Sequence, residues 1–238
     1  MKKILSFVLV ILILVSSMTI NVFADENNST KIKLGDVFVN VPYNENDIIV
    51  EYEKNEIEIR AIIKDKHTGE ILDIHGEYIQ PLDKLPQSII EQFPDELKTR
   101  ANSLKESNDI NMVSSQGDFF VKVVYNDKVF GSIVARLYCE FEYYSEYNYR
   151  NVTKIVDTYW REASSGTFKI ERETSNATVS EDKTGVTVWG GCNIVLTVTK
   201  DTSASIGIPA VFEFSHEVGE TQYYRTTIDD FRYSYSIY

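Results

Sequence analysis

The second half of the chain alternates apolar and polar residues with a period of two over several long stretches. The clearest stretch begins at Ile133, and similar stretches begin at Val186 and at Phe231. Successive side chains of a β-strand point to opposite faces, so the pattern predicts strands with one buried face. The apolar face of the first stretch comprises Ile133, Ala135, Leu137, Cys139, Phe141 and Tyr143, and the opposite face comprises Val134, Arg136, Tyr138, Glu140, Glu142 and Tyr144.

Short clusters of turn-forming residues separate these stretches at 165–166, 182–185, 201–203 and 218–220. Alternation between Ile206 and Phe214 predicts one more strand there. Many strands at short intervals, without helical periodicity, favour an antiparallel β-sandwich or an open barrel over residues 118–238. The chain is therefore expected to be mainly β.

The first half is expected to form a small β-hairpin region and one short helix. Apolar residues recur at every second position from Ile57 to Ile63, a turn containing Gly69 follows, and a second strand is predicted over 71–79. Pro94 precedes two acidic residues, which predicts a helix over 94–106, with a helical turn at 88–92 before it. The predicted organisation is an N-terminal β-rich segment (25–80), a helical linker region (81–117) and a β-sandwich domain (118–238).

Residues 1–24 have the pattern of a secretory signal peptide. Lys2 and Lys3 precede an apolar run, and small residues at Val22 and Ala24 fit a cleavage site. The apolar run is short for a membrane span, no cysteine lies near the cleavage point, and the C-terminus lacks an apolar tail. We therefore expect a secreted, extracellular protein of bacterial type, with no stable membrane anchor.

The charge balance argues against nucleic acid as a partner. The 238 residues include 24 Lys and Arg against 36 Asp and Glu, a net charge of −12, and removal of residues 1–24 makes it −14 because Lys2 and Lys3 leave with them. A strongly acidic chain repels phosphate backbones. An unknown protein or glycan is the expected partner.

Cys139 and Cys192 both lie on apolar strand faces, 53 positions apart. Exported proteins meet oxidising conditions in which two such residues can form a bond. The sequence therefore predicts a disulfide, which chain-entropy arguments value at roughly 4 kcal/mol. The alternative is two buried free thiols.

No residue pattern identifies a catalytic, metal or cofactor site. His67, His75 and His216 lack metal-ligand spacing, and we expect them on the surface or in hairpins. No G-x-S-x-G motif occurs, and Gly190 and Gly191 lie within a predicted strand, where glycine marks a bulge or a close approach. No catalytic residue, cofactor or metal is assigned.

The polar and aromatic face of the 133–144 strand is the candidate binding surface, through Tyr138, Glu140, Glu142 and Tyr144. Tyrosine offers large, stiff contact area with a polar tip, which suits protein and glycan partners. Glu140 and Glu142 lie about 6.6 Å apart on one strand face, a spacing that paired glycosidase carboxylates also permit.

Three hypotheses follow for the activity. The first is a non-enzymatic extracellular binding or interaction protein, favoured by the two-faced strand and the lack of catalytic motifs. The second is a secreted glycan-directed hydrolase that uses paired carboxylates. The third is a membrane-active β-toxin, because the Thr- and Ser-rich alternation over 195–205 resembles hairpins that insert as barrels.

Overall fold

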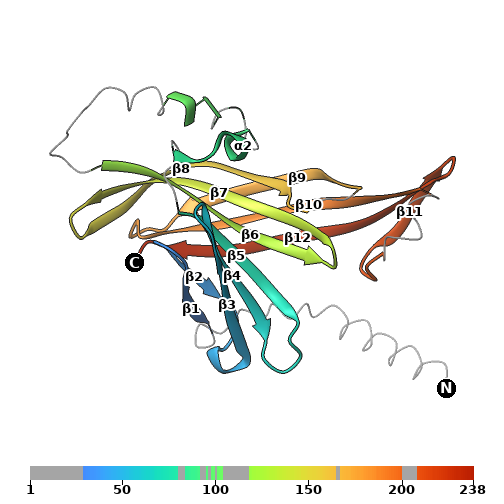
Figure 1. Cartoon of the computed structure of the whole chain (residues 1–238), viewed down its shortest axis with the longest axis horizontal. Helices are drawn as coiled ribbons and strands as arrows, with labels where there is room; N and C mark the ends of the chain where they lie inside the picture. The colour runs from blue at the N-terminus through green and yellow to red at the C-terminus, as the bar shows by residue number, and fades with distance from the viewer. Residues whose placement is uncertain are drawn as a thin grey trace, which may run out of the picture.

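A computed structural model describes residues 29–79, 84–91, 95, 98–99, 101–103, 118–164, 167–199 and 208–238. These residues form two antiparallel sheets of six strands each and a short helix (Figure 1), which confirms the predicted mainly β, two-sheet class. No ladder among the described strands closes either sheet into a barrel. The predicted signal peptide (1–24) lies outside the described residues.

The first sheet, called sheet 1, has the strand order β1-β2-β12-β10-β9, with β11 also paired to β12. Its strands are β1 (Thr30–Lys33), β2 (Phe38–Val41), β9 (Phe168–Val179), β10 (Gly185–Thr199), β11 (Glu213–Val218) and β12 (Thr221–Ser236). Strands β10 and β12 are the longest of the sheet and run side by side along the molecule, with the short β11 near one end of β12 (Figure 1).

The second sheet, called sheet 2, follows chain order from β3 to β8. Its strands are β3 (Ile48–Lys54), β4 (Glu58–Asp65), β5 (Ile71–Tyr78), β6 (Asp118–Phe130), β7 (Ile133–Glu146) and β8 (Tyr149–Glu162). A short 3-10 helix, η2 (Glu45–Asp47), precedes β3, and the helix α2 (Gln87–Ile90) lies between β5 and β6.

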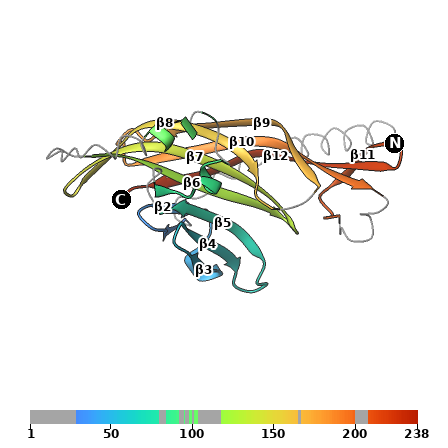
Figure 2. The ribbon, with the colours of Figure 1, turned by 45° about the horizontal axis from the view of Figure 1, so that its top comes forward.

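The N-terminal strands contribute to both sheets. Strands β1 and β2 join sheet 1 through β12, whereas β3, β4 and β5 join sheet 2 through β6. After a turn of the view, β3 to β5 lie below the long strands (Figure 2). The predicted domain boundaries at 80/81 and 117/118 fall next to residues outside the described ranges and stay a prediction.

Several predicted elements match the structure. The hairpin around Gly69 is β4 and β5, and Gly69 takes a positive φ of 72° in the turn. The helical turn at 88–92 corresponds to α2, and residues 95, 98–99 and 101–103 of the predicted 94–106 helix are helical. The register of β10 shifts next to Gly190 and Gly191, as expected for a bulge.

The strand predicted over 206–214 is wrong for most of its length. Residues 208–212 form a turn, and β11 begins only at Glu213. Pro209 has no backbone N–H to donate to a ladder, and the Pro209 carbonyl instead accepts from Phe212 N at 3.0 Å. The apolar alternation did not reveal this interruption.

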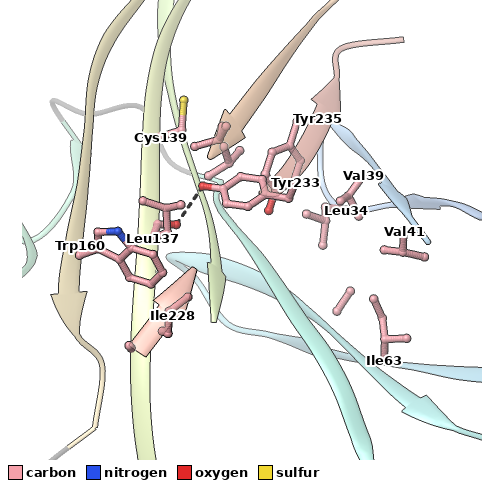
Figure 3. Close-up of a cluster of buried hydrophobic side chains, with 14 of the residues drawn as sticks. Leu34, Val39, Val41, Ile63, Leu137, Cys139, Trp160, Ile228, Tyr233 and Tyr235 are labelled. Atoms are coloured by element: carbon pink, nitrogen blue, oxygen red, sulfur yellow. Dashed lines mark hydrogen bonds between the residues drawn. The ribbon is translucent and has the colours of Figure 1, made fainter. Parts of the chain in front are cut away.

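A single hydrophobic core fills the space between the sheets. Trp160, Leu137 and Tyr235 are among its largest fully buried side chains (Figure 3). Two tyrosines of β12 cross this core: Tyr233 Oη donates to the Leu137 carbonyl at 2.9 Å, and Tyr235 Oη donates to the Tyr125 carbonyl at 2.6 Å. Each hydroxyl therefore links sheet 1 to the backbone of sheet 2.

Two polar clusters are buried beside these tyrosines. His75 lies on a hairpin strand as expected but is only 1% exposed, with Nδ1 3.2 Å from Tyr235 Oη and Nε2 3.0 Å from Asp73 Oδ2. Glu77 is completely buried and accepts from Lys122 Nζ at 2.5 Å and from Asp36 N at 3.0 Å. Because β1 and β2 flank Asp36, the second cluster also ties the two sheets together.

The predicted Cys139–Cys192 disulfide is wrong. Both side chains are buried as expected, Cys139 on β7 and Cys192 on β10, but both are free. A shared core is not sufficient for a bond, because a disulfide also requires the two Cβ atoms to approach within about 4.5 Å. The alternation of apolar residues shows which face of a strand a cysteine occupies, but not which residue of the opposite sheet it lies against. The two residues pack as small hydrophobic groups.

Two free thiols are therefore expected in the folded protein. Titration of the protein in denaturant with a thiol reagent should detect both, and the intact mass should not rise by two hydrogens on reduction. A reductant should leave the urea midpoint unchanged. A mass shift of two hydrogens would show that the cysteines are bonded.

Tyr235→Phe should lower the free energy of unfolding by about 1–3 kcal/mol, because it leaves a buried carbonyl and a histidine nitrogen without their partner. Urea denaturation followed by circular dichroism measures the change. Tyr147→Phe is the matched control, since that side chain is 98% exposed. Equal midpoints for the two variants would contradict a stabilising role for the Tyr235 hydroxyl.

Candidate functional site

The face of sheet 2 that points away from sheet 1, called the outer face, brings together side chains from three strands. Strand register places Tyr125, Tyr138 and Tyr159 in one row across β6, β7 and β8. The adjacent row contains Asp127, Arg136 and Arg161. Directly opposed residues on neighbouring strands have Cβ atoms about 4.5–5.5 Å apart, so the two rows form one continuous surface.

Part of this outer face is covered by the segment between β5 and β6. Leu85, Ile90 and Ala101 are buried against it in a second hydrophobic cluster, and the helical pieces, including α2, lie over the sheet in Figures 1 and 2. The sheet side of this cluster consists of Tyr78, Val123, Tyr125, Tyr138 and Tyr159. The region predicted as a linker therefore acts in part as a cap.

A cavity of about 700 Å³ opens beside this cap, within the roughly 300–1,000 Å³ of small-molecule sites. Its floor is aromatic and buried, and consists of Tyr78, Tyr138, Tyr159 and Trp160. Its walls are half-buried and consist of Ile57, Glu58, Arg136 and Ile170. Its rim is exposed and consists of Asn55, Arg161, Glu162, Ala163 and Glu173.

Internal contacts hold the floor rigid. The Tyr138 and Tyr159 rings stack with centroids 4.9 Å apart and planes inclined by 21°. Tyr159 Oη donates to Glu140 Oε1 at 2.7 Å, and Trp160 Nε1 donates to the Thr174 carbonyl at 3.1 Å. Burial, with Glu140 nearby, raises the pKa of Tyr159 well above its usual value. The tyrosine therefore remains a neutral, fixed ring at physiological pH.

Arg136, one of the wall residues, forms an ion pair with the completely buried Asp127. Its Nε and Nη2 donate to the two oxygens of Asp127 at 2.5 and 2.9 Å, and its guanidinium lies 3.6 Å from the centroid of the Tyr125 ring. Burial alone would lower the pKa of Arg136, but the hydrogen bonds and attraction to Asp127 raise it overall. Gly76 lies under the Tyr125 ring, which a Cβ at that position would overlap.

The rim carries charged groups that have no hydrogen-bond or ion-pair partner among the described residues. Arg161 lies over the Tyr159 ring at 5.2 Å, but neither it nor Glu162 or Glu173 makes a side-chain hydrogen bond or ion pair with any described residue. Asn55 Oδ1 accepts from two backbone N–H groups in its own turn at 2.8 Å, and its NH2 group has no partner among the described residues. These groups are available to a ligand.

The position of β8 explains why the cavity collects such different side chains. Strand β8 is the end of sheet 2 and makes ladder hydrogen bonds only with β7 among the described strands. The last four residues of β8 therefore line the cavity from both faces of the sheet. Tyr159 and Arg161 lie on one face, and Trp160 and Glu162 lie on the other.

The four residues predicted as a binding surface share one face of β7 but differ in environment. Tyr138 belongs to the cavity floor, and Glu140 is completely buried next to it. Glu142 lies 3.7 Å from Lys154 and accepts from Thr153 at 3.0 Å. Tyr144 is half-buried outside the cavity and donates to Glu146 at 2.6 Å. The structure thus brings only Tyr138 and Glu140 to the cavity region.

Most of the cavity was missed at the sequence level. Trp160 and Arg161 are adjacent residues of β8. The register of this strand against β7 shifts twice, near Glu140 and near Glu142. These bulges disrupt the simple alternation that marks β7. The contributions of Asn55 and Glu173 depend on packing between segments far apart in the chain, which no local pattern reveals.

Neither cysteine is activated as a nucleophile. Burial raises the pKa of both cysteine thiols, that of Cys192 to about 12 with a further contribution from Glu173, so neither is an activated thiolate at neutral pH. The described residues contain no group of three His, Cys, Asp or Glu side chains able to hold a metal ion. No described helix has both the length and the apolar character that a membrane span requires.

Comparison with protein-family models, curated proteins and solved structures finds no match to this chain.

Asp127→Asn should lower the free energy of unfolding by about 3–5 kcal/mol, because it removes a fully buried carboxylate that is the counter-ion of Arg136 and that also lies 3.5 Å from Arg60. Urea denaturation measures the loss. Asp230→Asn is the matched control: Asp230 pairs with Arg232 at 3.5 Å on the surface, and asparagine tolerates its positive φ of 47°. The control should change stability by less than about 0.5 kcal/mol. Similar losses in both variants would contradict the special role of the buried pair.

Proposed function

We propose that the protein is a secreted, non-enzymatic binding protein whose ligand occupies the cavity at the end of β8. The observation that carries this proposal is a rigid aromatic floor beside three charged side chains, those of Arg161, Glu162 and Glu173, that have no hydrogen-bond or ion-pair partner among the described residues. Preformed concave sites with an apolar base and a few converging polar groups are typical of ligand binding. Because the floor is already held in place, little ordering cost accompanies binding.

The geometry gives less support to a hydrolase that uses Glu140 and Glu142. Glu140 is completely buried and accepts a hydrogen bond from Tyr159, while Glu142 makes contacts with Thr153 and Lys154 outside the cavity. A glycosidase needs both carboxyl groups beside the scissile bond. A substrate touching both would have to displace the packing around Glu140.

The geometry also gives less support to membrane insertion of the 195–205 segment. Leu196 and Val198, at the end of β10, are buried in the core between the sheets. Insertion as a hairpin would expose these side chains and break their packing. Residues 200–207 lie outside the described ranges.

The proposal can be tested with Arg161→Ala, which removes an exposed rim guanidinium without disturbing the core. Immobilised glycan and peptide arrays should show at least one ligand class whose binding the substitution weakens about tenfold or more, since hydrogen bonds to charged groups contribute about 1.5–3 kcal/mol. Mass spectrometry of the recovered ligand should show no chemical change.

Arg232→Ala provides a matched control, because Arg232 is exposed and lies over Trp189 at 5.5 Å on sheet 1. It should leave the same binding within twofold of the unsubstituted protein. A ligand recovered cleaved would replace the proposal with an enzymatic function. Equal binding by both variants, or no binding on either array, would overturn the cavity as the site.

A further inference from the structure

The charges around the cavity restrict the class of ligand that it can take. Three carboxylates line it, those of Glu58, Glu162 and Glu173, against two guanidinium groups. One of these, Arg136, is already neutralised by the buried Asp127. An anionic ligand would therefore meet more negative than positive charge in the cavity, and the exported chain as a whole, with its net charge of −14, would also repel it.

A simple cation or an apolar ligand fits no better. The carboxylates would attract a cation, but a simple cation has no acceptor to offer the guanidinium of Arg161, which would stay unpaired beside it. An apolar ligand would remove water from the charged groups of Arg161, Glu162 and Glu173 without replacing those hydrogen bonds, which is strongly unfavourable. The rim therefore needs a ligand that is polar but carries no net charge.

Hydroxyl groups meet this need, because each can donate one hydrogen bond and accept others. A polyhydroxylated ligand can donate to Glu162 and Glu173 and accept from Arg161 and from the Asn55 amide. The floor adds a second, smaller contribution: its rings are at most 8% exposed, and where they reach the cavity their partial negative charge attracts polarised C–H groups. The ligand should thus combine hydroxyls at its edge with a C–H face, as sugar rings do.

We propose that the cavity binds a neutral oligosaccharide, with its hydroxyls on Arg161, Glu162 and Glu173 and its C–H groups on the small part of the aromatic floor that stays exposed. The inference rests on the proposed binding function and names its ligand class. The opening along the edge of β8 and the volume of about 700 Å³ favour a short stretch of glycan over a single sugar.

Trp160 provides a direct reporter for the test. The protein has two tryptophans, so Trp189→Phe leaves Trp160 as the only one, and Trp160 lines the cavity. Circular dichroism verifies that the fold is retained. Calorimetry on the unsubstituted protein gives a second measurement that does not depend on the variant.

The Trp189→Phe protein is titrated with neutral glucan, mannan and chitin oligosaccharides, with N-acetylated peptides and with inorganic phosphate. One oligosaccharide series should change Trp160 fluorescence, bind more tightly as it lengthens, and keep its affinity between about 0.05 and 0.5 M salt, because screening affects only charged ligands. Glu162→Gln and Glu173→Gln should each weaken binding about tenfold. The exposed Glu181→Gln should not.

The outcomes separate this inference from the proposed function. Peptide or phosphate binding at the cavity, without oligosaccharide binding, would overturn the glycan inference and leave the binding function standing. Oligosaccharide binding that all three glutamine variants retain equally would overturn the assigned contacts and the inference with them. No response to any probe by fluorescence or calorimetry would overturn both.

Discussion

Two tyrosine hydroxyls at the centre of the molecule connect its two sheets. Tyr233 and Tyr235 extend from β12 across the core and donate to the carbonyls of Leu137 and Tyr125. Their burial raises the pKa of both well above the usual value, so both hydroxyls keep the proton that they donate. A buried donor and acceptor that satisfy each other avoid the penalty of an unmade hydrogen bond, which fixes the relative position of the sheets.

The same contacts support the cavity from behind. Strands β6 and β7 receive the tyrosine hydroxyls through their backbone, and on the outer face they carry Tyr125, Arg136 and Tyr138. The Tyr125 ring contacts both Gly76 and the Arg136 guanidinium. The positions of the floor and wall residues are therefore set through backbone and ring contacts that continue into the core. The exposed rim groups are the part left free to adapt to a ligand.

The period-two pattern was sufficient to predict the fold class and the faces of β7, β10 and the end of β12, because burial of alternate side chains is a local property of a strand. The pattern was not sufficient for features that depend on contacts between distant segments or on the backbone chemistry of a single residue. The predicted disulfide failed because Cys139 and Cys192 share a core without being bonded. The strand predicted around Pro209 failed because an apolar pattern does not record a missing N–H group. Tyr138 was predicted as a binding residue, but its stacking partner Tyr159 depends on strand register across a bulge.

The cavity lies where the backbone ladder of sheet 2 ends, at β8. In the interior of a sheet, each strand has neighbours on both sides, and its two faces are separated by the ladder. At β8 the ladder ends, and contact with β9 continues through side chains, such as the Trp160 indole on the Thr174 carbonyl and the Ser175 hydroxyl on the Thr158 carbonyl. Side-chain bonds leave wider spacing than a ladder, so space remains beside the edge. A binding site can form there without removing any backbone hydrogen bond from either sheet, which lets aromatic and charged residues gather at little cost to the fold.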